Sequence, residues 1–402
     1  MIGRALGGLA LLVTLNGCDG GGAGDPALSK AGPQAAKAAR SDPKVPAAAS
    51  IDGLDPGWKG VEPGGETTCS DGSKYRFFVR PGDPGKLLVY FQGGGSCWLA
   101  RNCDPHLDPT YKRTVGEKEP QRYDGIFDLE HPENPFAEYS IVMATYCTGD
   151  VHLGDNIASY QAPPGDDHAT HGLEVRHRGI ANVQAVLEWV YANFAAPAEI
   201  FVTGSSAGAI PSPYYAWQIA EHYPDARITQ LGDAAGGYRQ QDRGAGVQLE
   251  RWGTLAYLGQ YPEFETMTAK DFSFESLYIA AARRHPEVLF AEYDTAEDRV
   301  QRKFLAISGQ EPESLKTYLD ANQADIRAEV DNFRTFIAGG DSHTILARPQ
   351  FYELRSGGVR IRDWVARLAD HETVEDVTCS NCAEADGTTF DEHGARDSSE
   401  DR

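Results

Sequence analysis

The chain has 402 residues and a formal net charge of −22. An acidic surface of this kind disfavours nucleic acid and anionic membranes as partners, so neither is expected to bind. Hydrophobic residues make up 41% of the chain, which is enough for a globular body with a sizeable core. No internal stretch reaches the roughly 18 uninterrupted apolar residues that a transmembrane helix requires.

The first 18 residues have the pattern of an export signal. One positive charge, Arg4, precedes the apolar run LGGLALLVTL, and the segment ends in LNGC. This ending resembles a bacterial lipobox, in which Cys18 is lipidated and becomes the first residue of the mature protein. The alternative is a plain secretory signal that is cut nearby. Both predict an exported protein, and the lipobox predicts contact with a bacterial membrane only through the lipid anchor.

A folded body is expected between two segments of low complexity. Residues 19–56 are rich in Gly, Ala, Pro, Lys and Ser and lack large apolar side chains, which predicts a flexible linker. The acidic residues 383–402 predict a disordered tail. The body, 57–382, then contains six cysteines. An even number in an oxidising compartment predicts three disulfides, with roughly fifteen possible pairings.

Strand-like and helix-like segments alternate along this body. Strands are predicted at 74–79, 86–92, 139–146, 199–204 and 288–294, and strands that run into a turn or loop are predicted within 227–237 and 333–340. Helices are predicted at 175–194, 214–223, 295–307 and 361–369. The alternation predicts an α/β fold with a mostly parallel sheet and helices on both faces. Residues 240–287 interrupt the rhythm and predict a helical insertion over one end of the sheet.

The segment FVTGSSAGAI, 201–210, contains a candidate nucleophile. It fits the pattern G-x-S-x-G in one frame only, with Ser206 at the centre. A predicted strand precedes it and a predicted helix follows it. In that context a sharp turn presents the central serine hydroxyl at the end of the strand, and the glycines permit close packing. The alternative is an ordinary glycine-rich turn.

A serine hydroxyl needs a base to remove its proton, and the base needs an acid to orient it. His343, just past a predicted strand, is preferred as the base over His222, His285 and His371. For the acid, spacing favours Asp294 at the end of VLFAEYD, with Asp233 as the main competitor. Two other candidates are weaker: Asp298 has the spacing of a helix cap, and Asp341 is too close to His343 in sequence.

The run FQGGGSCW, 91–98, is a candidate oxyanion loop. It follows an early strand, and its glycines would allow backbone N–H groups to approach a substrate oxygen. The expected donors are the N–H groups of Gly94 and Gly95, together with that of Ala207 after the nucleophile.

Together these motifs resemble the pectin acetylesterase and Notum family of carboxylesterases. The resemblance covers about 65–350 and rests on TTCSDGS, FQGGGSCW, NPF, YCTGDVHLGD, HRGIANVQAVLEW, GSSAG, EYDTAEDRVQ and SHTIL. It implies an α/β-hydrolase with the triad Ser206, Asp294 and His343, and with neither a metal nor an organic cofactor. It also implies the disulfides Cys69–Cys147 and Cys97–Cys103, which leaves Cys379–Cys382. One departure is Ser96, where relatives carry Trp before the cysteine, so the mouth of the pocket should differ.

Two sets of polar residues could be mistaken for metal ligands. They are Asp150, His152 and Asp155, and His168, His171 and His177, and neither has a recognised zinc spacing. We expect polar loop residues near the pocket instead.

The sequence therefore predicts an exported, monomeric serine carboxylesterase that cleaves short-acyl esters, with acetyl as the first choice. An acetylated polysaccharide is the candidate substrate. A lipase or polyester-type esterase is one alternative, and an inactive tethered binding protein on the same fold is the other.

Overall fold

In a computed structural model of the protein, residues 57–161, 172–239 and 246–384 are described. All of them belong to one unit of the chain. The export signal with Cys18, the linker, and all but the first two residues of the acidic tail lie outside these ranges, as do His168 and His171.

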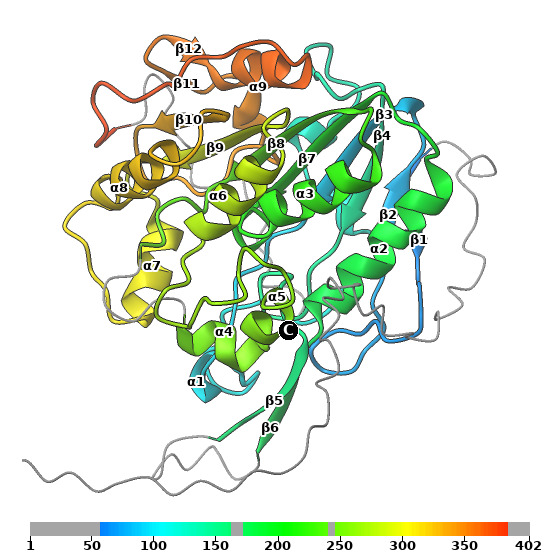
Figure 1. The fold of residues 1–402 in the computed structure, drawn as a ribbon, viewed down its shortest axis with the longest axis vertical. Coiled ribbons are helices and arrows are strands. Elements are labelled where there is room, and N and C mark those ends of the chain that lie inside the picture. The colour runs from blue at the N-terminus through cyan, green and yellow to red at the C-terminus, as the bar shows by residue number, and fades with distance from the viewer. Residues whose placement is uncertain (1–56, 162–171, 240–245, 385–402) are drawn as a thin grey trace, which may run out of the picture. The chain divides into compact units, whose positions relative to one another are not determined.

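An eight-stranded sheet forms the centre of the body (Figure 1). Its strand order is β1-β2-β4-β3-β7-β8-β9-β10. Strands β4, β3, β7, β8, β9 and β10 are parallel, whereas β1 and β2 pair antiparallel at one edge. The bounds are β1 Lys59–Val61, β2 Phe77–Arg80, β3 Asp83–Phe91, β4 Tyr139–Ala144, β7 Glu199–Ser205, β8 Arg227–Asp233, β9 Leu289–Thr295 and β10 Phe333–Ala338. The carboxyl ends of the parallel strands therefore meet at one edge, where α/β folds place their sites.

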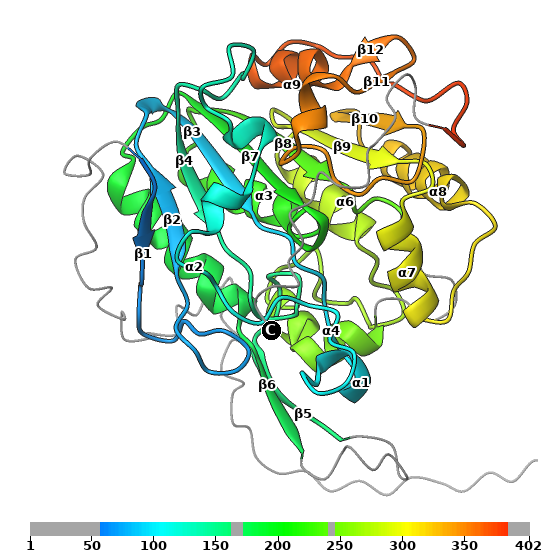
Figure 2. The same cartoon turned by 180° about the vertical axis from the view of Figure 1, so that it is seen from behind.

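Both faces of the sheet are buried, which explains why the central strands read as continuous apolar runs. In β3, Leu87, Val89 and Phe91 enter one core cluster, and Leu88 and Tyr90 enter the other. The first face is covered by α2 (Gly179–Asn193), α3 (Ser212–His222) and α6 (Glu275–Arg284), which lie in front of the sheet in Figure 1. The second is covered by α9 (Ile361–Ala369) and by the short helices η3 (Gly125–Phe127) and η5 (Pro349–Tyr352), seen from behind in Figure 2.

The predicted α/β class is confirmed, and the predicted strands lie within a few residues of those observed. One prediction is wrong at its start: the helix expected from 175 begins at Gly179, because residues 173–177 form the strand β6. This strand pairs with β5 (Asn156–Tyr160) in a hairpin that the sequence analysis missed. The remaining elements are α1 (Ala100–Cys103), η2 (Glu119–Arg122), η4 (Ser206–Gly208), α7 (Arg299–Ile307), α8 (Leu315–Arg327), β11 (Arg355–Ser356) and β12 (Val359–Arg360).

The insertion is helical, as expected from its sequence. After residue 245 it forms α4 (Gly246–Trp252) and α5 (Thr254–Leu258), which lie beside α1 and the β5–β6 hairpin (Figures 1 and 2). Among the helices of 57–161, 172–239 and 246–384, none combines the length and the apolar character that crossing a membrane requires.

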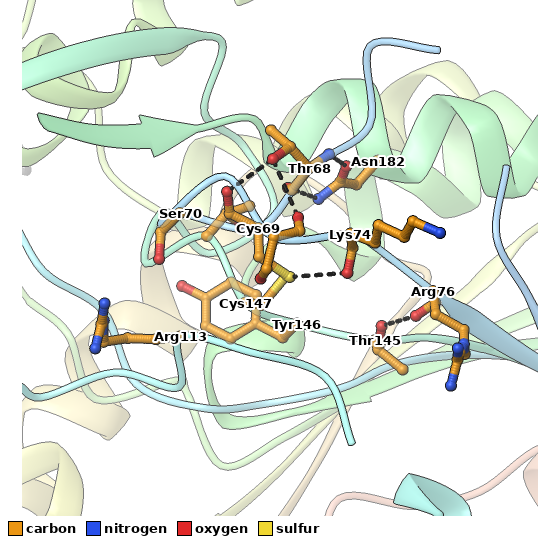
Figure 3. Close-up of a disulfide and its surroundings, with 12 residues drawn as sticks. Thr68, Cys69, Ser70, Lys74, Arg76, Arg113, Thr145, Tyr146, Cys147 and Asn182 are labelled. Atoms are coloured by element: carbon orange, nitrogen blue, oxygen red, sulfur yellow. Dashed lines mark hydrogen bonds between the residues drawn. A yellow bond between two sulfur atoms is a disulfide. The ribbon is translucent and has the colours of Figure 1, made fainter. Parts of the chain in front are cut away.

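Three disulfides form, with the pairing that the family resemblance implies: Cys69–Cys147, Cys97–Cys103 and Cys379–Cys382. Figure 3 shows the first of them, which joins the loop before β2 to the chain just after β4. Beside it, the backbone of Thr68 exchanges two hydrogen bonds with the side chain of Asn182 on α2, at 3.0 and 2.9 Å (Figure 3). The disulfide therefore ties the loop before β2 to the end of β4 next to Tyr146, and the Thr68–Asn182 hydrogen bonds tie the same loop to α2.

Candidate active site

Ser206 lies on a strained turn between β7 and α3. Its φ is +55°, in the left-handed region that non-glycine residues seldom adopt. The flanking glycines are required sterically, because a Cβ on Gly204 would lie 2.2 Å from the Gly208 oxygen and one on Gly208 would lie 2.1 Å from the Phe91 oxygen. The pattern G-x-S-x-G thus has the geometry of a nucleophile elbow.

His343 follows β10, and its orientation is fixed by Asp298. The imidazole Nδ1 lies 2.7 Å from Oδ2 of Asp298, which is fully buried. The other ring nitrogen, Nε2, is buried and has no hydrogen-bond partner among the described residues, and none links it to Ser206 Oγ. An Nδ1–H that donates to a carboxylate leaves Nε2 with a free lone pair, which is the state a general base needs.

Asp298 performs two tasks with its two oxygens. Oδ1 accepts the N–H groups of Val300 and Gln301 and so caps α7, while Oδ2 accepts from His343 and from the Gln301 side chain. Asp298 thus has a structural role at a helix start, as expected, but it is itself the N-cap of α7, whereas Thr295 ends β9. The capping role does not exclude a second role for the same carboxylate. The sequence analysis missed Gln301, whose side chain donates to both Asp294 and Asp298. The one available signal was its position three residues after Asp298.

Asp294, the expected acid, does not contact His343. Its Oδ1 accepts from Gly236 N–H at 3.0 Å and from the Gln301 side chain at 2.9 Å, and its Oδ2 has no partner among the described residues. Burial raises the pKa of Asp294, so the neutral acid is favoured. A neutral carboxyl group that does not contact the imidazole is poorly suited to stabilise an imidazolium. The hydrogen bonding therefore favours Asp298 over Asp294 as the acid that orients His343.

Asp233, the other competitor, ends β8 and is also away from the imidazole ring. Burial raises its pKa to about 6, although hydrogen bonds from Ser205, Leu346 and Ile345 favour the ionised form. Its contacts are with the residues next to Ser206 and close to His343, rather than with either of them.

The glycine loop lies against the elbow. A Cβ on Gly93 would be 3.0 Å from Cβ of Ser206, and Gly95 has a φ of +73° with the Thr110 carbonyl oxygen 1.9 Å from where its Cβ would be. The backbone N–H groups of Gly94 and Gly95 donate to no backbone carbonyl of another described residue, and Ala207 follows Ser206 directly in η4. They are therefore available to a developing oxyanion.

A buried polar network holds this loop at its first residue, Gln92. Its side-chain oxygen accepts from Lys112 Nζ at 3.0 Å and from Tyr146 N–H at 2.9 Å, and its amide nitrogen donates to Glu119 at 2.8 Å. Lys112 and Glu119 are themselves paired at 2.5 Å. The backbone oxygen of Gln92 lies 2.8 Å from Nε2 of His152. Every polar group of the Gln92 side chain is thus satisfied, which makes the loop rigid.

An apolar pocket adjoins Ser206 and contains about 550 Å³ of empty space, open solvent included. Ser206 shares its wall with Gly95 and Ala207, and none of the described lining residues is charged. The others are Ser96, Trp98, Val151, Ile210, Tyr238, Gln248, Trp252, Phe274, Phe304, Leu305, Ser308 and Gln310. Trp98, which follows the cysteine of the glycine loop, therefore contributes to the pocket directly.

The acidic and histidine residues of GDVHLGD serve the fold. Asp150 accepts from Thr148 and from the backbone of His152 and Gly179, while His177 lies between the Thr148 carbonyl and Tyr160 OH. Burial lowers the pKa of His152 and of His177 to about 4, so both stay neutral. Within the part of the chain that the structure describes, no group of three His, Cys, Asp or Glu residues could hold a metal ion.

Comparisons with known proteins agree with this architecture. The sequence model of the pectinacetylesterase family matches residues 62–248. The crystal structure of the Wnt deacylase Notum from Drosophila is similar with a TM-score of 0.54 and 17% sequence identity, over 78% of this chain and 94% of that one. No curated protein matches the sequence significantly. The chain thus has a Notum-like α/β-hydrolase fold.

Proposed function

We propose that this protein is a serine carboxylesterase of the pectinacetylesterase and Notum family. The observation that supports it most is the pairing of Asp298 with His343 at one edge of the sheet, where Ser206 lies on a strained elbow. The match of the family model, which ends before β9, supports the family assignment through the glycine loop and the elbow.

In the proposed mechanism Ser206 attacks the ester carbonyl carbon while His343 Nε2 takes the hydroxyl proton. The carbonyl oxygen becomes an oxyanion and accepts hydrogen bonds from Gly94, Gly95 and Ala207. His343 then gives its proton to the leaving alcohol, and the acyl group remains on Ser206. A water molecule, deprotonated by His343, releases the carboxylic acid and restores the serine. Asp298 holds the tautomer of His343 throughout and stabilises the imidazolium.

The substrate is a neutral ester with a short acyl group, acetate first. The apolar wall beside Ser206 suits an uncharged acyl group, and both the uncharged lining and the net charge of −22 oppose a polyanion such as de-esterified pectin. The alcohol side is then a neutral or sparsely charged acetylated carbohydrate. The enzyme is exported, and Cys18 anchors it to a bacterial membrane by a lipid.

Hydrolysis of para-nitrophenyl acetate, butyrate and octanoate by residues 57–402 tests the proposal, with Ser206→Ala as the control. We expect rates that fall with chain length and a loss of about 10⁴-fold or more in kcat for the variant. A preference for octanoate would replace the short-acyl assignment with a lipase or polyester activity. A folded wild-type protein with no activity on any ester would instead favour the binding-protein alternative.

A further inference from the structure

Asp233 connects the nucleophile elbow with the histidine loop. It is fully buried at the end of β8, between β7 and β9. Its Oδ2 accepts the hydroxyl proton of Ser205 at 2.6 Å. Its Oδ1 accepts from the backbone N–H of Ile345 at 3.0 Å, and Oδ2 accepts from that of Leu346 at 3.1 Å. A single carboxylate thus bonds the residue before Ser206 and the backbone two and three residues after His343.

Three of the six non-glycine residues with positive φ in the described ranges lie next to these contacts; the other three are Val151, His152 and His371. Ser206, Ala234 and Thr344 have φ of +55°, +67° and +62°, although none is a glycine. Each is adjacent in sequence to a member of the hydrogen-bonded group: Ser206 to Ser205, Ala234 to Asp233, and Thr344 to Ile345. Left-handed conformations of such residues persist only where surrounding contacts enforce them. For Thr344, a β-branched residue, the conformation is especially unfavourable.

The chemistry of the contacts favours a carboxylate. All three partners donate to it: Oδ2 accepts from Ser205, Leu346 and Ile345, and Oδ1 accepts a second, shorter bond from Ile345. An asparagine would present a donor to one of these N–H or O–H groups and would lose at least one bond. A structural salt bridge does not account for the buried acid, because its hydrogen bonds within the described ranges all come from uncharged donors.

We propose that Asp233 is a positioning residue that sets the separation between Ser206 and His343. The inference rests on the proposed function, since it concerns the same serine and histidine. No hydrogen bond joins Ser206 Oγ to His343 Nε2, so the two groups must approach when substrate binds. The hydrogen bonds of Asp233 to Ser205, Ile345 and Leu346, here called the clamp, limit how far apart the two groups lie beforehand. A displacement of about 1 Å between reacting groups can lower the rate on the order of 100-fold.

The test uses Asp233→Asn and Ser205→Ala, which break the clamp from opposite sides. Thr203→Val is the matched control, because Thr203 Oγ also makes a buried hydrogen bond from β7 to β8, to the Leu231 carbonyl, but does not reach the histidine loop. The measurements are kcat and KM on para-nitrophenyl acetate, the rate of Ser206 labelling by a fluorophosphonate, and the thermal midpoint of each protein.

We expect Asp233→Asn to lower kcat and the labelling rate on the order of 100-fold with KM within about threefold. Ser205→Ala should lower them about tenfold, and the double variant should be no worse than Asp233→Asn alone, since both remove one clamp. Thr203→Val should lower the thermal midpoint but leave kcat within about twofold. A purely structural role would lower kcat only through the unfolded fraction.

The proposal is overturned if Asp233→Asn retains wild-type kcat when folded, or if Thr203→Val loses as much activity. Should Asp233→Asn fail to fold, Ser205→Ala decides: unchanged kcat in a folded sample contradicts the clamp, and a loss supports it. Failure of the proposed function is seen separately, because wild-type protein would then be inactive or Ser206→Ala would be active.

Discussion

The sharpest prediction separates Asp298 from Asp294 as the acid of the catalytic site. In Asp298→Asn, the side-chain oxygen must still accept from Val300 N–H and Gln301 N–H, because only an acceptor can cap α7. The amide nitrogen is then forced toward Nδ1 of His343, where Oδ2 now lies at 2.7 Å. Its N–H group donates to Nδ1, so the ring proton moves to Nε2 and the base can no longer accept from Ser206.

A triad acid changed to its amide, with the wrong histidine tautomer as the result, lowers kcat by about 10⁴-fold, which is about 5.4 kcal/mol in the barrier. Asp294→Asn is the matched comparison. Its oxygen still accepts from Gly236 and Gln301, and the nitrogen supplies a donor beside Glu292, whose Oε2 has no partner among the described residues. Burial already favours the neutral form of Asp294, so kcat should fall less than about tenfold.

The assay is kcat on para-nitrophenyl acetate with both variants at equal folded concentration, checked by thermal melting. Asparagine caps helices about as well as aspartate, so Asp298→Asn should stay folded. If Asp294→Asn is the inactive variant and Asp298→Asn is not, the hydrogen-bond argument for Asp298 fails and Asp294 is the acid.

Three further predictions follow from other contacts. Gly95→Ala should lower kcat on the order of 100-fold, because the new Cβ would clash with the Thr110 oxygen and displace an oxyanion donor; an unchanged kcat would remove Gly95 from that role. Lys112→Met should lower the free energy of unfolding in urea by about 3 kcal/mol, since Glu119 stays buried and unpaired, and Lys112→Met with Glu119→Gln should recover part of that loss. Because the pKa of His177 is about 4 in the folded protein and near 6.5 in the unfolded chain, protonation favours unfolding as the pH falls from 6.5 to 4. The thermal midpoint of His177→Asn should therefore fall less than that of the wild type over this range, and equal slopes would contradict the assignment.

The hydrogen-bond partner of His343 is the clearest case in which local sequence patterns were insufficient. Asp298 was set aside because Thr295 and Asp298 have the spacing of a helix cap, and it does cap α7. A pattern along the chain reports what one oxygen does locally. It cannot report that the second oxygen faces a loop 45 residues away, because that contact depends on β9 and β10 pairing in parallel.

Sequence alone determined the α/β class, and it predicted the elbow serine, the glycine loop and the histidine, because each depends on short-range patterns: apolar runs, turn glycines and the order of strands. The described structure contains Ser206 on its strained turn and the disulfides that the family resemblance implied. The tertiary structure alone decided which carboxylate meets His343, and it gave Asp233 its contacts with both loops. Four acidic side chains, Asp233, Glu292, Asp294 and Asp298, are buried near the same edge of the sheet, and the sequence ranking that preferred Asp294 did not reflect which of them contacts His343. Only the packing of strands and loops decides which oxygen lies within hydrogen-bond distance of which donor.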